Sequence, residues 1–252
     1  MRPTQRWIMS RVRKAIKDFN LISPGDRIAV GLSGGKDSLG LLYVLSQLRR
    51  FRQMAFDLLA IYVDLGWTGI GIAPAKIEPL RSFCQELQVP LVCETTKIAE
   101  IVFTARQEPN PCALCANLRR GALNNAAKGL GCQKVALGHH ADDVIETYLL
   151  NLFYNAQMNT FSPRTNLTRS GLTLIRPLVY LEEKAISQLA QEEGFPTIEN
   201  PCPVSGKTKR QEIKEIVRWL NYRFPEIRQR FLTALKNFKP ESFQDWNPDQ
   251  VR

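Results

Sequence analysis

The chain of 252 residues lacks the features that mark several classes of protein. No apolar run approaches the ~20 residues that a membrane-spanning helix requires. Glycine and proline number only 15 each, too few for a collagen-like or low-complexity chain. The opening stretch MRPTQRWIMSRVRKAIK carries charge throughout, so we expect no signal peptide and a cytoplasmic protein. The six cysteines therefore favour core positions, a metal site or catalysis over a disulfide framework.

Acidic residues are also in short supply. The chain has 24 Asp and Glu against 34 Lys and Arg, which gives a net charge of +10 and a pI near 9.5. This excess indicates a polyanionic partner such as a nucleic acid, a nucleotide or an anionic membrane. A basic protein without such a partner is the plainer alternative. Hydrophobic residues make up 44% and charged residues 23%, as in ordinary globular proteins of one or two domains.

Short apolar strands alternate with helical segments along most of the chain. Strands are predicted at 28–32, 58–64, 89–95, 134–138 and 172–176. This alternation predicts an α/β fold with a doubly wound, mostly parallel five-stranded sheet. We divide the chain into an N-terminal basic helix (1–24), an α/β domain (25–200), a C-terminal helical segment packed on it (201–238) and a tail (239–252).

The strongest motif is Ser33-Gly34-Gly35-Lys36-Asp37-Ser38, which follows the first strand and opens a helix. Its glycines let the backbone approach a ligand, and N–H groups at a helix N-terminus favour an anion. The serine hydroxyls and the Lys36 charge add to this preference. A carboxylate at Asp37 suits such a loop when Mg²⁺ accompanies the anion. The spacing fits neither a Walker loop nor a dinucleotide motif, and a purely structural Gly-rich turn is the alternative.

A second polar segment, Gly138-His139-His140-Ala141-Asp142-Asp143, follows the fourth strand and begins another helix. Because the carboxyl ends of parallel strands meet at one edge of the sheet, we expect it near the first motif. Two carboxylates there can hold Mg²⁺ or orient a ligand. Capping of the helix by the two aspartates is the alternative.

Three of the six cysteines stand in proline-flanked positions, namely Cys112 and Cys115 in PCALC and Cys202 in NPCPVS. The first two form a C-x2-C pair, which is typical of redox, zinc and iron–sulfur sites. Three thiolates are one short of a closed zinc site, which His139 or His140 would complete, and they also suit a [4Fe–4S] cluster with one open iron. Two buried cysteines without a metal are a further alternative. The remaining three, Cys84, Cys93 and Cys132, fall where small core residues belong.

Basic residues recur at spacings of three and four on the predicted helix 207–222, at Lys207, Arg210, Lys214 and Arg218. Arg119 and Arg120 follow the C-x2-C pair. We predict that these side chains contact RNA phosphates, although a solvated helix face would look the same.

Together these segments resemble the tRNA 2-thiocytidine synthetase family of the PP-loop ATP pyrophosphatase superfamily. The resemblance rests on SGGKDS, PCALC followed by ANLRRGAL, LGHHADDVIETYLLNLFY, IRPLVYLEEKAI and Cys202, and it covers roughly residues 10–238. It implies that residues 25–200 form a PP-loop domain. The implied ATP-binding residues are Ser33, Gly34, Gly35, Lys36, Asp37, Ser38, Val63, Asp64, Gly138, Asp143 and Arg176.

The resemblance also implies a reaction: adenylation of the C2 oxygen of a tRNA cytidine at position 32, then replacement of AMP by sulfur. The implied catalytic residues are Lys36, Asp37, Asp143, Cys112, Cys115 and Cys202, with Mg²⁺ at Asp37 and a [4Fe–4S] cluster on the three cysteines. The implied partners are tRNA, ATP and a sulfur donor such as a cysteine desulfurase, with no membrane; a homodimer is compatible with the resemblance.

One departure from the family concerns the third cysteine site. Members often carry a second C-x2-C there, whereas this chain has Cys202-Pro203-Val204-Ser205. The related 2-thiouridine synthetases carry extra zinc knuckles that this chain lacks, and the lysidine synthetases lack the cysteine set. A thiolase or ligase acting on another tRNA base, or a zinc-stabilised nucleic-acid binding protein, are the alternatives that remain.

Overall fold

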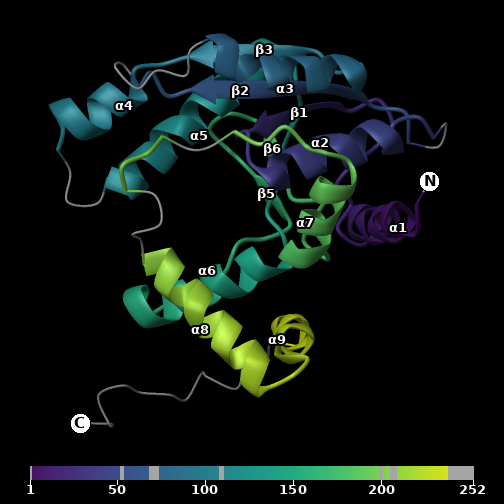
Figure 1. Cartoon of the computed structure of the whole chain (residues 1–252), viewed down its shortest axis with the longest axis vertical. Coiled ribbons are helices and arrows are strands. Elements are labelled where there is room, and N and C mark those ends of the chain that lie inside the picture. The colour runs from purple at the N-terminus through teal and green to yellow at the C-terminus, as the bar shows by residue number, and fades with distance from the viewer. Residues whose placement is uncertain are drawn as a thin grey trace. The chain divides into compact units, whose positions relative to one another are not determined.

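The structure, a computed structural model, describes residues 2–51, 54–67, 74–107, 111–198, 201–204 and 209–237. The chain forms two compact units, one of residues 1–144 and 161–206 and one of residues 145–160 and 207–252. Figure 1 labels the helices and strands of both. Within the described ranges, no helix is long and apolar enough to cross a membrane.

The first unit is built around a six-stranded sheet of order β3-β2-β1-β4-β6-β5. The strands are β1 (Arg27–Leu32), β2 (Asp57–Asp64), β3 (Leu91–Thr95), β4 (Lys134–Ala136), β5 (Arg164–Asn166) and β6 (Thr173–Ile175). All neighbours pair in parallel except β5, which runs antiparallel to β6. The parallel α/β sheet and its five predicted strands are confirmed. The predicted number of strands is one too few, because the polar, mostly exposed β5 carries no apolar pattern.

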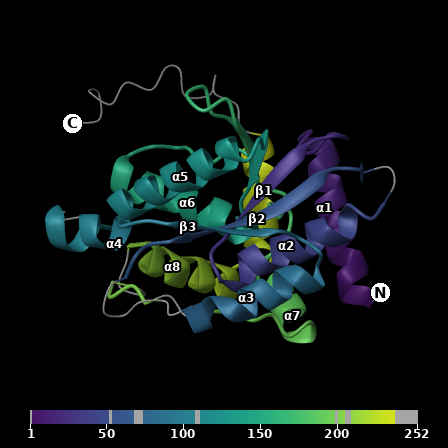
Figure 2. The ribbon, with the colours of Figure 1, turned by 90° about the horizontal axis from the view of Figure 1, so that it is seen from above.

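Helices cover both faces of this sheet. In the first unit they are α1 (Pro3–Asp18), α2 (Lys36–Leu48), α3 (Pro74–Glu86), α4 (Ile98–Glu100), the π-helical η2 (Ile101–Ala105), α5 (Pro111–Gly129), the start of α6 (Ala141–Asn155) and α7 (Glu183–Glu192). Figure 2 shows α5 on one side of the sheet and α2, α3 and α7 on the other. The segment 98–105 was not predicted to be helical.

Two hydrophobic clusters fill the spaces between sheet and helices. One joins α1, α2, α3 and α7 to the sheet through residues such as Val12, Leu41 and Ile186, and the other joins α5 to it through Leu123 and Val135. A sheet covered on both faces needs strands that are apolar throughout. Six consecutive residues of β2, from 58 to 63, are accordingly buried.

The N-terminal basic helix that the sequence predicts is α1, and it is amphipathic. Ile8, Val12 and Ile16 are at most 6% exposed and belong to the first cluster. Basic side chains of α1 are exposed, and the helix packs beside α2 and α7. The apolar stripe therefore anchors α1 to the first unit and leaves its charged stripe in solvent.

The second unit comprises residues 145–160, which include most of α6, together with α8 (Lys209–Arg223) and α9 (Ile227–Lys236). Ile145 and Leu149 form a hydrophobic cluster with Ile213 and Val217. Residues 145–160 thus group with the C-terminal helices rather than with the predicted 25–200 segment. The predicted tail, 239–252, lies outside the described residues.

Candidate active site

The carboxyl ends of β1 and β4 lie side by side at one edge of the sheet. The chain leaves β1 toward β2 on one side and leaves β4 toward β6 on the other, so the strand order reverses between them. Parallel α/β sheets bind ligands at such a switch point. The motif 33–38 follows β1 and the motif 138–143 follows β4, so the two predicted loops meet there.

The loop after β1 is closed by its own serines. The Ser33 N–H donates to Ser38 Oγ at 3.0 Å, and Ser38 Oγ donates to the Gly35 carbonyl at 2.9 Å. Gly34 has φ +82°, a conformation that glycine adopts without strain. Gly35 is the N-cap of α2 and has no side chain to cap the helix. The first N–H groups of α2 therefore point to the switch point without a capping side chain, as anion binding requires.

Gly138 is required by the close approach of the two loops. A Cβ at this position would lie 2.9 Å from the carbonyl carbon and oxygen of Asp37 and 3.1 Å from the Ser38 nitrogen. Backbone atoms cannot give way as the end of a flexible side chain can. Gly138, predicted as an ATP-binding residue, thus has a clear packing function beside the loop.

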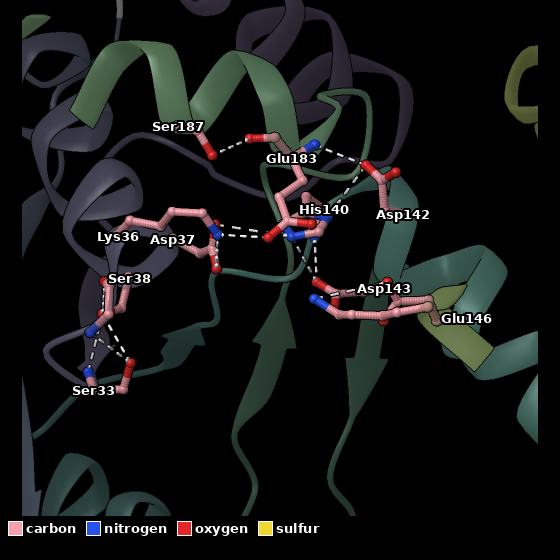
Figure 3. Close-up of polar contacts among 12 residues, drawn as sticks. Ser33, Lys36, Asp37, Ser38, His140, Asp142, Asp143, Glu146, Glu183 and Ser187 are labelled. Atoms are coloured by element: carbon pink, nitrogen blue, oxygen red, sulfur yellow. Dashed lines mark hydrogen bonds and ion pairs between the residues drawn. The ribbon is translucent and has the colours of Figure 1, made fainter. Parts of the chain in front are cut away.

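Lys36 lies between two carboxylates. Its Nζ is 3.1 Å from Asp37 Oδ1 and 2.8 Å from Glu183 Oε1, at the first residue of α7 (Figure 3). Burial lowers the pKa of Lys36, but hydrogen bonding to Glu183 and the charge of Asp37 outweigh it, so the pKa is raised above its usual value. The ammonium is therefore fully protonated at neutral pH and held beside the loop.

His140 is 2% exposed and faces carboxylates of both loops. Its Nε2 lies 3.8 Å from Asp37 Oδ1 and 3.5 Å from Asp143 Oδ2, and its backbone N–H donates to Asp143 Oδ2 at 3.0 Å. The Asp37 and Asp143 carboxylates, predicted separately from two motifs, thus flank one imidazole edge. Two carboxylates that leave room for phosphate oxygens are a donor set that suits Mg²⁺.

Asp142 links the second loop to α7. This side chain is 2% exposed, and its Oδ2 accepts the Glu183 N–H at 2.7 Å. The carboxylate satisfies one of the N–H groups that a helix N-terminus leaves unpaired. Asp142 therefore fixes the first turn of α7, which in turn places the Glu183 carboxylate on Lys36. Helix capping, the alternative considered for this motif, holds for Asp142 in α7 rather than in its own helix.

Two other predicted ATP-binding residues end β2. Val63 is 6% exposed and packs in the cluster beneath α5, so only its backbone is available to a ligand. Asp64 Oδ1 accepts the Gly66 N–H at 3.0 Å and shapes the turn after the strand.

Arg176, the remaining predicted phosphate contact, is 7% exposed at the end of β6. Its Nη1 donates to the Ser162 carbonyl at 2.6 Å and to Thr165 Oγ1 at 3.2 Å, and its Nε donates to His139 Nδ1 at 3.3 Å. Burial, with a smaller contribution from the Arg120 charge, lowers the pKa of Arg176 to about 10. Arg176 joins the β5–β6 segment to the second loop.

Among the three proline-flanked cysteines, the pKa of Cys115 is affected by the other two. Cys112 is exposed and Cys115 half-buried in the first turn of α5, a helical rather than a loop position, and Cys202 is half-buried. None of the six thiols forms a disulfide. Burial raises the pKa of Cys115, Arg119 lowers it, and Cys202 and Cys112 raise it further. Within the described ranges, no group of three or more Cys, His, Asp or Glu side chains is arranged to hold a metal ion.

Comparison with known proteins identifies the family. The PP-loop domain family matches residues 5–220. The tRNA-cytidine(32) 2-sulfurtransferase of Pelobacter propionicus is 41% identical over 247 residues, which cover 96% of this chain and 90% of the relative. The enzyme of the same name from Geobacter metallireducens is 39% identical over 243 residues, covering 95% and 93%. The chain belongs to the tRNA 2-thiocytidine synthetases of the PP-loop family. It is therefore an enzyme, a tRNA sulfurtransferase.

A solved structure shares the fold of this tRNA 2-thiocytidine synthetase family member. The U34-tRNA thiolase NcsA from Methanococcus maripaludis, determined with its [4Fe-4S] cluster, has a TM-score of 0.74 at 24% identity. The similarity covers 97% of this chain and 84% of that chain. It confirms the predicted PP-loop fold.

The predicted RNA contacts of this synthetase family member lie in both units. Arg119 is half-buried and Arg120 exposed on α5 of the first unit. In the second unit, Arg210 Nη1 and Lys214 Nζ each lie 3.9 Å from a carboxylate oxygen of Glu146, while Arg218 is exposed. Lys207 lies outside the described residues.

Glu183 and His140 are the site residues that the sequence prediction missed. Glu183 lies 147 residues from Lys36 along the chain, in the LEEKAI segment that carried the family resemblance. A carboxylate in that segment gave no further signal, because acidic residues are common at any helix N-terminus. His140 belongs to a predicted motif, but nothing local indicated that its ring is buried.

We predict that Glu183→Gln separates the binding of ATP from its cleavage. The amide removes the carboxylate charge that repels the phosphates, so KM for ATP falls by about two- to fivefold. It also weakens the contact that positions Lys36, so kcat falls by a similar factor. Steady-state release of pyrophosphate measures both. Glu86→Gln, the same change in an exposed side chain of α3, is the matched control; equal kinetics in the two variants contradict the prediction.

Proposed function

We propose that the chain adenylates the C2 oxygen of a tRNA cytidine, at position 32, and replaces that oxygen with sulfur. In the first step, the C2 oxygen attacks the α-phosphorus of ATP, the bond between the α-phosphorus and the bridging oxygen breaks, and pyrophosphate leaves. In the second, hydrosulfide attacks C2, the C2–O bond breaks, and AMP leaves with the oxygen; where the donor carries a persulfide, two thiols first reduce it to hydrosulfide and become a disulfide. Loss of one proton, from the sulfur or from the base, then leaves neutral 2-thiocytidine.

The observation that carries this proposal is the loop of residues 33–38 beside Asp143. The uncapped start of α2 and the protonated Lys36 suit the β- and γ-phosphates of ATP. Asp37 and Asp143, both within 3.8 Å of His140 Nε2, would hold Mg²⁺ together with phosphate oxygens. When bound, Mg²⁺ would neutralise charge that develops on the departing pyrophosphate.

The cysteine set supports sulfur transfer. Cys112, Cys115 and Cys202 would hold a [4Fe–4S] cluster, because thiolates are its usual ligands and both Cys112 and Cys202 raise the pKa of Cys115. Such a cluster, when bound by three protein ligands, supplies one iron that is open to an exogenous sulfur atom. Burial raises the pKa of Cys115, and Arg119 partly opposes this rise.

We assign the contacts to tRNA phosphates to Arg119, Arg120, Lys207, Arg210, Lys214 and Arg218. Glu146 offsets part of the charge of Arg210 and Lys214, so the exposed Arg218 is the strongest candidate in the second unit. A sulfur donor such as a cysteine desulfurase, a homodimer and a place in the cytoplasm, where tRNA and ATP are present, belong to the same proposal.

Nucleoside mass spectrometry of total tRNA tests the function. We expect 2-thiocytidine to disappear from a strain that lacks this chain and to return when the chain is supplied again. An Arg218→Ala variant that restores 2-thiocytidine only at a reduced level would separate the role of this residue in tRNA binding from the chemical steps. Loss of 2-thiouridine or lysidine in place of 2-thiocytidine would assign the chain to another base, and unchanged nucleosides would refute a tRNA-modifying function.

A further inference from the structure

An open groove lies between α1 and the first turns of α7. Its lining includes Thr4 and Trp7 from α1, and Lys184 and Gln188 from α7, and its volume is about 490 Å³. Glu182, just before α7, also contributes to the lining. The proposed reaction uses none of these residues.

Trp7 presents its ring to solvent in this groove. It is 45% exposed, whereas Ile8 and Val12, which hold α1 against the core, are 1% and 0% exposed. The Arg11 guanidinium lies over the indole, 5.5 Å from the ring centroid. The indole is therefore not needed to anchor α1, and a cation lies at its face.

The exposed side of α1 is basic. It carries Arg6, Arg11, Arg13 and Lys17, and none of these four makes a salt bridge within the described part of the chain. On the α7 side, Lys184 and Glu182 oppose each other in charge, and the Glu192 carboxylate accepts hydrogen bonds from the groove residues Thr4 and Gln188. The positive charge of α1 beside an exposed aromatic ring is complementary to a polyanion with flat, stacking groups.

We propose that this groove binds an unpaired nucleotide of the tRNA substrate, with its base stacked on Trp7 and adjacent phosphates near Arg6, Arg11 and Lys184. The inference rests on the proposed function. Proteins recognise single-stranded RNA loops by stacking splayed bases on aromatic side chains within a basic surface. The bound nucleotide is distinct from the one that reacts, because the groove and the phosphate-binding loop lie on different sides of α7's first turn.

The groove is connected to the active site through that turn. Glu183 contacts Lys36 at 2.8 Å, while its sequence neighbours Glu182 and Lys184 line the groove. One RNA strand can therefore pass from the groove to the switch point over a single helical turn. Because the groove lies next to the active site, we expect it to bind a loop nucleotide near the target cytidine.

A basic helix with an exposed tryptophan also suits an anionic membrane surface. The contacts of α1 favour RNA, because a membrane-bound helix must offer its apolar face to the lipid. Here Ile8, Val12 and Ile16 are buried in the core of the first unit. The groove has a single exposed indole and a charged rim, so vesicle binding is an alternative outcome of the test.

The test compares Trp7→Ala and Trp7→Phe with wild type. The probe is a synthetic anticodon stem-loop with cytidine at position 32, and a fully paired RNA duplex of equal length is the second ligand. We expect Trp7→Ala to bind the stem-loop roughly 10-fold more weakly and Trp7→Phe to retain most affinity, with little change for the duplex. Phe51→Ala is the matched control, because Phe51 is 43% exposed and lies 6.0 Å from the Arg13 guanidinium but does not line the groove.

Tryptophan fluorescence of the wild-type chain gives a second readout that does not depend on the folding of Trp7→Ala. Binding of the stem-loop should quench a component that is missing from Trp7→Phe, one of four tryptophans in the chain. The groove proposal is overturned if Trp7→Ala binds the stem-loop as tightly as wild type does. It is also overturned if the substitution weakens binding to phosphatidylserine vesicles alone. Wild-type protein that binds no stem-loop refutes the proposed function as well, so the two failures are distinguishable.

Discussion

Asp37→Ala should reduce pyrophosphate release from ATP by roughly 100-fold or more while the chain stays folded. Asp37 brings a carboxylate to a loop that otherwise offers only N–H groups, hydroxyls and Lys36. Its Oδ1 lies 3.8 Å from the same His140 nitrogen that Asp143 approaches to 3.5 Å, so the two carboxylates are placed to act on one cation. Loss of one of two protein ligands would leave the phosphates without a positioned metal ion.

The effect on stability should be small. Asp37 lies in the first turn of α2, where a negative charge contributes about 0.3–1 kcal/mol, and its ion pair with Lys36 is partly exposed. Circular dichroism should therefore report a native fold. Asp57→Ala removes an exposed carboxylate at the opposite, amino end of β2 and serves as the control. Normal pyrophosphate release by a folded Asp37→Ala variant would contradict the proposal that Asp37 contacts a metal ion.

The loop of residues 33–38 was predictable because its determinants are local. A strand, two glycines and a helix start are adjacent in sequence, and the hydrogen bonds of the two loop serines join residues at most five positions apart. The meeting of this loop with the segment 138–143 followed from sheet topology, since both strands are parallel. Gly138 shows the limit of that reasoning. A side chain at this position would clash with the Asp37 backbone across the site, and the local sequence does not reveal that contact.

Contacts between distant segments were not predictable in the same way. The Lys36–Glu183 pair spans 147 residues, and the Asp142–Glu183 hydrogen bond spans 41. From the sequence alone, the carboxylates of Glu183 and Asp142 cannot be told from ones that cap a helix or face solvent. The strand β5 was missed for a related reason, because three polar residues pair through the backbone alone and leave no hydrophobic period.

The basic stripe predicted on helix α8 shows a third kind of limit. Its spacing placed Arg210 and Lys214 on one helical face, and the structure agrees. A periodicity does not reveal what the face meets, and here both cations lie 3.9 Å from the buried Glu146. In contrast, the sequence predicted only a basic helix for residues 1–24, and the structure places the Arg11 guanidinium over the exposed Trp7 ring.

Cys202→Ser should abolish both iron binding and tRNA thiolation while ATP binding at residues 33–38 survives. Cys202 is separated from the C-x2-C pair along the chain, yet it raises the pKa of Cys115. A serine hydroxyl is a poor substitute for a thiolate as an iron ligand. Iron and acid-labile sulfide in anaerobically purified protein, together with 2-thiocytidine formed on tRNA, measure the two losses.

Cysteines of the core provide the control for this change. Cys84 and Cys132 are 1% and 7% exposed, and burial raises the pKa of both thiols, to about 11 for Cys84. Both thiols are enclosed in the hydrophobic clusters, where an iron–sulfur cluster would have to displace core side chains. Cys84→Ala and Cys132→Ala should therefore keep iron, sulfide and thiolation near wild type, at a packing cost of roughly 1–2 kcal/mol.

Two results would contradict the assignment of Cys112, Cys115 and Cys202 as the cluster ligands. Stoichiometric zinc without sulfide would make the three thiols a structural site and leave the origin of the sulfur elsewhere. Loss of iron from a folded Cys84→Ala or Cys132→Ala variant would show that the core thiols take part. Retention of ATP binding in Cys202→Ser is equally necessary, because the phosphate-binding loop draws its contacts from Lys36, Asp37, Gly138 and Glu183 rather than from the cysteines. A variant that loses iron and ATP together would mean that the cysteines hold the fold of the site rather than the sulfur chemistry alone.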